Sequence, residues 1–351
     1  MDIKVLEALS NADAVAGREG EIRKILKDKM DSYSDSIFSD NLGSIIFEKK
    51  GTKEGPKIMI AAHMDEVGFI VRSIDEKGMI HVIELGRVKP LAKFMQEVRI
   101  TTRSGKKITG IINGIYSDKT NDASNVYVDI GACSKNDVTE LGINIGDMVT
   151  YTTKFKPLEL DNIVTGKAFD DRLGCFLMTE VIKELSEVNH DNDVYFTGTS
   201  SEEVGIRGGE TATYKVNPDI VIAIEVACYQ NEFVRDHSNN RQIGKGPMLT
   251  LFDRTMAPSD KIINFIRDES KKLEIEIQED MFNSGGTDAG KAHLVRSGIP
   301  AIVLCLPVRY GHCAYSIGNI NDIENLKKLL IGLIKVINKE NYNKLVNFIE
   351  V

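Results

Sequence analysis

The chain has 351 residues, a length typical of about two domains, and its 42% hydrophobic and 27% charged content excludes disorder as the main state. With 44 Lys and Arg against 52 Asp and Glu, the net charge of −8 argues against general binding to nucleic-acid phosphates. No stretch approaches the roughly 18 consecutive apolar residues of a membrane-spanning helix, and the first residues lack a secretory-signal pattern, so we expect no membrane partner.

Helix and strand patterns alternate toward both ends of the chain. Residues 21–33 place apolar side chains at helical spacing, and residues 57–62 form a short apolar run typical of a buried strand. Further helices are predicted over 171–188, over 259–273 with Ser259 as N-cap, and from a capping box at Asn321 to about 339, and further strands over 194–199, 219–226 and 299–306. This alternation predicts an α/β fold whose sheet is mostly parallel, twisted and covered by helices.

The middle of the chain differs from its ends because it has no long helical stripe. Short alternating runs separated by turn signals predict strands there, at 98–102, 107–112 and 126–130. We therefore predict that residues 67–163 form a small all-β domain, a barrel or sandwich. It would be inserted into a catalytic α/β domain made of residues 1–66 and 164–351.

Histidines and carboxylates collect where the predicted strands end. The residues of this kind are His63, Asp65 and Glu66 after one strand, Glu202 and Glu203 after the next, Glu225 and His312 at two more, and Asp170 and Asp171 before a helix. Ligands of open α/β sheets bind outside the carboxyl ends of the strands. We therefore expect these side chains to form one convergent site.

Two histidines with several carboxylates favour divalent zinc, cobalt or manganese. A single ion needs about three protein ligands, whereas five or six candidates converge here, so we expect two ions sharing a carboxylate. Such a pair lowers the pKa of a bridging water and polarises a carbonyl oxygen. The adjacent Glu202 and Glu203 suit a division between a proton-transferring base and a metal ligand.

Five segments of the chain resemble motifs of the M42 family of metallo-aminopeptidases. In chain order they are AAHMDEVG, GKAFDDRLG, SSEEVGIRGG, SGGTDAG and PVRYGH. That family includes tetrahedral and glutamyl aminopeptidases and relatives labelled endoglucanases. The resemblance covers nearly the whole chain and implies an enzyme that removes N-terminal residues from short peptides. It also implies a PDZ-like or barrel-like insertion that helps to build dimers and, from them, a hollow dodecamer.

The resemblance also implies a set of metal ligands. His63 and Glu225 would bind the first ion, Asp170 would bridge both ions, and Glu203 and His312 would bind the second. The peptide that follows Asp170 would be cis. Glu225 stands where the family usually has Asp, so we expect it to bind with altered geometry or metal preference.

The remaining candidate residues would act on the substrate or on the ligands. By resemblance, Glu202 would be the general base and acid, and Asp65 would orient the first histidine. Thr287, Asp288 and Arg309 would bind substrate. The preferred N-terminal residue and the native metal stay open.

Several alternatives accompany this interpretation. Taken singly, His63 could be a core or loop histidine, the Glu202–Glu203 pair a solvated helix start, and Asp170–Asp171 a helix cap. A related metal-dependent deacylase or carboxypeptidase, or a metal-binding but inactive paralogue, would share the same residues. A glycosidase is disfavoured because its two carboxyl groups flank the scissile bond about 5–9.5 Å apart, which adjacent glutamates do not obviously supply.

The cysteines favour a reducing cytoplasm, because their number is odd and no CxxC pair occurs. Cys175, Cys228 and Cys305 lie in apolar runs and are predicted to be core residues. Cys313 follows His312, in a segment that differs from the family pattern. The other histidines, at 81, 190, 237 and 293, are predicted to be structural or exposed.

Overall fold

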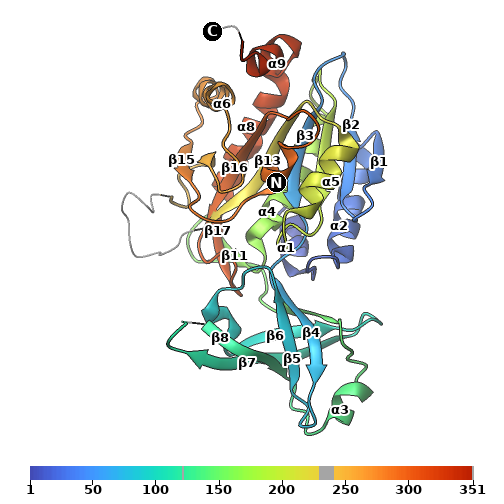
Figure 1. Cartoon of the computed structure of the whole chain (residues 1–351). Coiled ribbons are helices and arrows are strands. Elements are labelled where there is room, and N and C mark those ends of the chain that lie inside the picture. The colour runs from blue at the N-terminus through green and yellow to red at the C-terminus, as the bar shows by residue number, and fades with distance from the viewer. Residues whose placement is uncertain (121, 229–240, 350–351) are drawn as a thin grey trace.

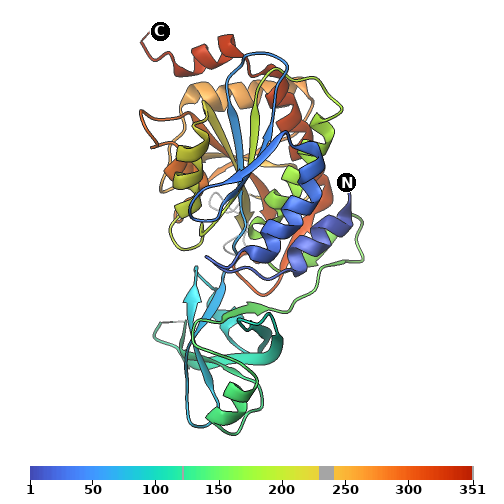
Figure 2. The ribbon, with the colours of Figure 1, turned by 90° about the vertical axis from the view of Figure 1, so that its right-hand side faces the viewer.

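The computed structural model describes residues 1–120, 122–228 and 241–349, and these form two parts (Figure 1). The upper part in the figure is an open sheet with helices around it, and the lower part is a barrel. Figure 2 shows the sheet lying between its helices. His237, one of the predicted structural or exposed histidines, lies outside the described residues.

The open sheet has eight strands, and its central four run parallel. Its strands are Ser36–Ser39 (β1), Ile45–Lys49 (β2), Ile58–His63 (β3), Val194–Thr199 (β12), Ile220–Cys228 (β13), Met248–Phe252 (β14), Gln278–Met281 (β15) and Ala301–Val308 (β16). The order is β1-β2-β12-β3-β13-β16-β14-β15, and β12, β3, β13 and β16 are parallel. These four are buried almost throughout, which explains why they read as continuous apolar runs.

Helices cover both faces of this sheet. One face carries Ile3–Asn11 (α1), Gly20–Met30 (α2), Phe169–Leu185 (α4), Asp260–Lys272 (α6) and Ile320–Val336 (α8), and the other carries Arg207–Val216 (α5) and Asp288–Ala292 (α7). Large side chains such as Leu26, Phe176 and Leu330 fill the first interface, whereas Ala212 and Ala289 let the second pair of helices approach closely. No helix in the described ranges has the length and apolar character needed to cross a membrane.

The barrel is inserted after β3. Its strands are Gly68–Ile74 (β4), Ile80–Leu85 (β5), Gln96–Thr101 (β6), Lys107–Ser117 (β7), Asp122–Asp129 (β8) and Met148–Tyr151 (β9). They close in the order β4-β5-β8-β7-β6-β9, with every pair antiparallel, around a core that includes Phe69, Ile112 and Tyr151. The predicted α/β fold with an inserted all-β barrel is thus confirmed. The division at residues 66/67 and 163/164 stays a prediction.

A three-stranded sheet and several short elements complete the chain. They are Lys156–Pro157 (β10), Ile163–Gly166 (β11), Ser316–Asn319 (β17), Asp31–Tyr33 (η1), Pro90–Lys93 (η2), Lys135–Glu140 (α3) and Lys339–Val346 (α9). Ser259 is the N-cap residue of α6, as predicted, although its side chain makes no capping hydrogen bond. One predicted cap needs correction. Helix α8 is capped by Asn319 and not Asn321, because the Asn319 side chain accepts the N–H of Asn321.

Candidate functional site

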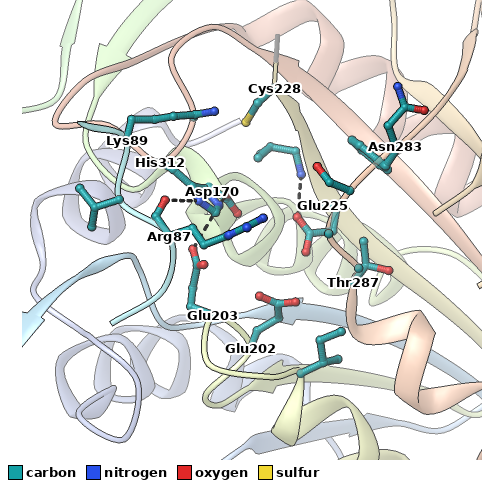
Figure 3. Close-up of a pocket in the computed structure, with 18 of the residues that line it drawn as sticks. Arg87, Lys89, Asp170, Glu202, Glu203, Glu225, Cys228, Asn283, Thr287 and His312 are labelled. Atoms are coloured by element: carbon teal, nitrogen blue, oxygen red, sulfur yellow. Dashed lines mark hydrogen bonds and ion pairs between the residues drawn. The ribbon is translucent and has the colours of Figure 1, made fainter. Parts of the chain in front are cut away.

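A cavity of about 530 Å³ lies where the carboxyl ends of the central strands face the barrel. Its walls come from the loop after β12, the end of β13, the loop after β16, residues 87–90 of the barrel, and residues 282–287. Figure 3 shows the labelled carboxylates and His312 converging in it. The predicted histidine and carboxylate ligands therefore do meet at one place.

Asp170 lies between the two histidines. Its Oδ1 is 3.0 Å from Nε2 of His63, and its Oδ2 is 3.1 Å from Nε2 of His312. Oε1 of Glu225 is 3.8 Å from Nε2 of His63, and Oε1 of Glu203 is 3.6 Å from Nε2 of His312. The five residues thus form two sets that share Asp170. One set faces its Oδ1 and contains His63 and Glu225, and the other faces its Oδ2 and contains His312 and Glu203.

Asp170 reaches this position because helix α4 begins irregularly. Asp170 and Asp171 have non-helical dihedral angles, and the peptide between them is cis, as the resemblance implied. Oδ1 of Asp171 accepts the N–H of Gly174 at 3.0 Å. The helix-cap interpretation therefore holds for Asp171, while Asp170 turns toward β3.

Each histidine directs Nε2 into the cavity because its other ring nitrogen is engaged by a carbonyl. Nδ1 of His63 is 3.0 Å from the carbonyl oxygen of Asp65, and Nδ1 of His312 is 2.8 Å from that of Arg87. A carbonyl only accepts, so Nδ1 carries the hydrogen and a neutral ring keeps its lone pair on Nε2. Metal-binding histidines are commonly oriented in this way.

The carboxylates of the site are buried close together. Burial, reinforced by the Asp170 charge, raises the pKa of Glu203 to about 7 and raises that of Glu225 well above its ordinary value. Burial also raises the pKa of Glu202. Oε1 of Glu203 has no hydrogen-bond partner among the described residues. Buried acids of this kind need a compensating charge, and imidazole nitrogens with carboxylate oxygens suit zinc, cobalt or manganese.

Asp65 acts mainly on the two adjacent glutamates. Its carboxylate oxygens accept the backbone N–H groups of Glu202 at 3.0 Å and of Glu203 at 3.1 Å. The hydrogen bond to His63 is made by the Asp65 carbonyl, whereas the carboxylate lies 3.7 Å from that ring. The predicted orienting role therefore belongs to the Asp65 backbone, and its side chain joins the end of β3 to the loop after β12.

Glu202 can be assigned to either of two roles on geometry alone. It lines the cavity and is buried beside Glu203. Ligand atoms of His63, Glu202 and Glu225 lie within 4.8 Å of one another, as do those of His63, Asp170 and Glu203. Glu202 is thus placed to transfer a proton or to bind an ion.

Of the three predicted substrate residues, only Thr287 lines the cavity. Asp288 begins α7 and accepts a 2.5 Å hydrogen bond from the Thr199 hydroxyl, so it is turned toward β12 and buried. Arg309 is held by a backbone bridge to Ile317 just after β16. Asp288 and Arg309 therefore lie outside the lining of the cavity, and their contact with substrate stays a prediction.

Several cavity residues escaped prediction because they depend on how the barrel docks. Arg87 and Lys89 follow β5, and Figure 3 shows both side chains beside the acidic centre. Within the described ranges, neither side chain has a hydrogen-bond or ion-pair partner, whereas Nε of Arg241 is 2.7 Å from Asp280. Cys228, predicted to be a core residue, also lines the cavity. No local sequence signal identifies these positions.

The whole chain is similar to known aminopeptidases. A family model described as M42 glutamyl aminopeptidase matches residues 43–329. The glutamyl aminopeptidase of Lactococcus lactis subsp. cremoris is 32% identical over 355 residues, which covers 98% of each chain. The TET aminopeptidase of the marine sediment archaeon Thaumarchaeota archaeon SCGC AB-539-E09 superposes with a TM-score of 0.93, at 33% identity over 98% of each chain. The Pyrococcus horikoshii TET1 peptidase, which can assemble into a tetrahedron or a large octahedral shell, gives 0.84 at 26% identity over 95% of this chain and 99% of its own.

Proposed function

Because the chain belongs to the M42 glutamyl aminopeptidase family and is a peptide-bond hydrolase, we propose that it is a dinuclear metal-dependent aminopeptidase acting on short peptides. The observation that carries this proposal is the position of Asp170, whose two oxygens face Nε2 of His63 and of His312. One carboxylate between two histidines is the arrangement expected of a ligand shared by two ions.

The two sets of residues would hold one ion each. His63, Glu225 and Oδ1 of Asp170 would form the first position, and Glu203, His312 and Oδ2 of Asp170 the second. When bound, zinc or cobalt, or alternatively manganese, would supply the Lewis acidity that activates a water and polarises the scissile carbonyl.

Glu202 would move the protons of the reaction. Burial raises the pKa of its carboxyl group, and an elevated pKa favours acceptance of a proton from the attacking water. The same group would then donate that proton to the leaving amine. Asp65 would hold Glu202 in place through the backbone N–H that it accepts.

A peptide with a free α-amino group is expected to lose its first residue, whereas the same peptide with an acetylated N-terminus is not. This contrast follows if the site takes a free amine beside its acidic groups. Mass spectrometry of the products, on protein reloaded with each candidate metal, measures it. Release of the C-terminal residue would support a carboxypeptidase, removal of the acetyl group would support a deacylase, and metal binding without turnover would support the inactive paralogue.

We propose, too, that substrates carry a carboxylate. Two divalent ions would balance the four negative charges of Asp170, Glu202, Glu203 and Glu225. The positive charges of Arg87 and Lys89, which reach into the cavity from the barrel, would then have no negative partner there.

Substitution of both cations with glutamine is expected to raise KM about 10-fold for carboxylate-bearing substrates, a usual size for a lost charge-assisted contact near solvent. Glutamyl and glutaminyl anilides, which differ only in charge, separate a side-chain carboxylate from general binding. Peptides with free and amidated C-termini separate a terminal carboxylate in the same way. An equal change for charged and neutral members of both pairs would contradict the assignment.

The barrel would also join subunits, in a cytoplasmic homo-oligomer built from dimers that can assemble up to a dodecamer. Leu91, Met95 and Ile115 on the barrel are 82%, 70% and 59% exposed, and apolar side chains of this kind would be available to pack against a second subunit. The assembly of the Pyrococcus horikoshii relative supports this proposal. The absence of disulfides among the five cysteines fits a reducing compartment.

A further inference from the structure

The loop that carries His312 packs on the barrel. Ala314 belongs to the hydrophobic core of the barrel, together with Val88 and Tyr151, and Cys313 packs against that core. Two hydrogen bonds add to this packing: Nδ1 of His312 donates to the Arg87 carbonyl at 2.8 Å, and the N–H of Lys89 donates to the His312 carbonyl at 3.0 Å. His312 also has a φ of +59°, a conformation that a residue with a side chain keeps only when its surroundings hold it.

The same barrel segment contacts the other ligand of the second metal position. At Gly86, where φ is +79°, an added Cβ would lie 2.9 Å from Oε2 and 3.2 Å from Cβ of Glu203. A side chain larger than hydrogen there would displace Glu203. Residues 86–89 of the barrel therefore contact both Glu203 and His312, the two ligands that belong only to the second metal position.

The first metal position has a different support. His63 and Glu225 belong to β3 and β13, which are paired in the middle of the sheet. The side chain of His63 is 2% exposed, whereas that of His312 is 28% exposed. The first histidine is thus held by the sheet itself, and the second depends on the barrel.

One buried carboxylate anchors the barrel to the α/β part. Asp13, which is fully buried after α1, receives Nε and Nη2 of Arg99 from β6, each at 2.5 Å. Nζ of Lys107 from β7 and the hydroxyl of Thr150 from β9 lie 2.8 Å from the same carboxylate. Three barrel strands thus converge on a single acceptor.

From this arrangement, and resting on the proposed dinuclear function, we infer that docking of the barrel through Asp13 sets the affinity of the second metal position only. Arg99 is then a positioning residue for Glu203 and His312, although it touches neither. The inserted barrel completes the metal centre in addition to any role between subunits.

Calorimetric titration of metal-free protein with Zn²⁺ tests this inference. In Arg99→Gln, the Kd of the second ion is expected to rise about 10-fold, the lower end of the effect of losing a group that orients a ligand directly, because Arg99 acts through the barrel; the first ion is expected to bind as in the wild type. Lys107→Gln keeps Arg99 and removes a partly exposed cation, so a smaller shift in the same position is expected even if Arg99→Gln folds poorly. Arg103→Gln, an exposed arginine on the same barrel, is the matched control and leaves both ions unchanged.

Two variants that each lack a ligand of one metal position show which position Arg99→Gln affects. Arg99→Gln is expected to weaken the ion that remains in Glu225→Gln protein and to leave unchanged the ion that remains in Glu203→Gln protein. Two outcomes would overturn the inferred role of the barrel and leave the dinuclear proposal standing. One is equal weakening of the remaining ion in the Glu225→Gln and Glu203→Gln proteins. The other is unchanged ion binding in both, with folded Arg99→Gln and Lys107→Gln proteins. A wild-type protein that binds fewer than two ions would overturn the dinuclear proposal itself, and this inference with it.

Discussion

Replacement of Glu202 with glutamine is expected to lower kcat by about 10²- to 10⁴-fold, the usual contribution of a general acid–base group, with both ions still bound. Glutamine keeps the size of the side chain and cannot accept the proton of the attacking water. Steady-state kinetics with an aminoacyl anilide, and metal content by mass spectrometry on the same sample, measure the two parts of this result.

Metal content is the decisive part, because the ligand atoms of Glu202, His63 and Glu225 also lie within 4.8 Å of one another. The comparison variant is Glu203→Gln, which is expected to lose one ion, and Glu210→Gln, at an exposed position of α5, should change neither quantity. Loss of an ion from Glu202→Gln would make Glu202 a ligand. Full activity of this variant would remove it from the mechanism.

Long apolar runs made the centre of the fold predictable. Strand β12 spans the predicted residues 194–199, and β3, β13 and β16 differ from their predicted ranges by at most two residues at either end. A strand that is buried on both faces has apolar side chains at nearly every position, because neither face contacts water. The edge strands β1 and β15 are short, partly exposed and mixed in composition, so no periodic pattern distinguishes them from loops.

Some residues of the candidate site could likewise be predicted from the sequence, and others could not. His63, Glu203 and Glu225 are predictable because each lies in or just after the last residues of a central parallel strand, and these strands end at the same edge of the sheet. Arg87 contacts the loop of His312 across 225 positions of sequence, and this contact exists only once the barrel has docked. Asp288 does not line the cavity, because a Gly-rich turn indicates an open loop but does not say which way its side chains face.

Replacement of Asp170 with asparagine is expected to reduce binding of both ions and to lower activity by about 10³-fold or more, since metal assistance supplies several kcal/mol of transition-state stabilisation. Asparagine has nearly the same shape, but it is neutral and offers one acceptor oxygen and one donor group, so neither of the two positions that Asp170 faces keeps a charged carboxylate ligand. Metal content and kcat, measured across added zinc, cobalt and manganese, follow both effects.

The matched control for Asp170→Asn is Asp161→Asn, which removes an exposed carboxylate just before β11. His63→Ala and His312→Ala provide the complementary comparison, because each removes a ligand from one position and should leave the other able to bind. Two tightly bound ions in Asp170→Asn would show that the carboxylate is not shared. The loss of one ion alone would place Asp170 in a single position, and the two histidines would then belong to independent sites. Loss of both ions in Asp170→Asn, against one in each histidine variant, is the pattern that a bridging ligand requires.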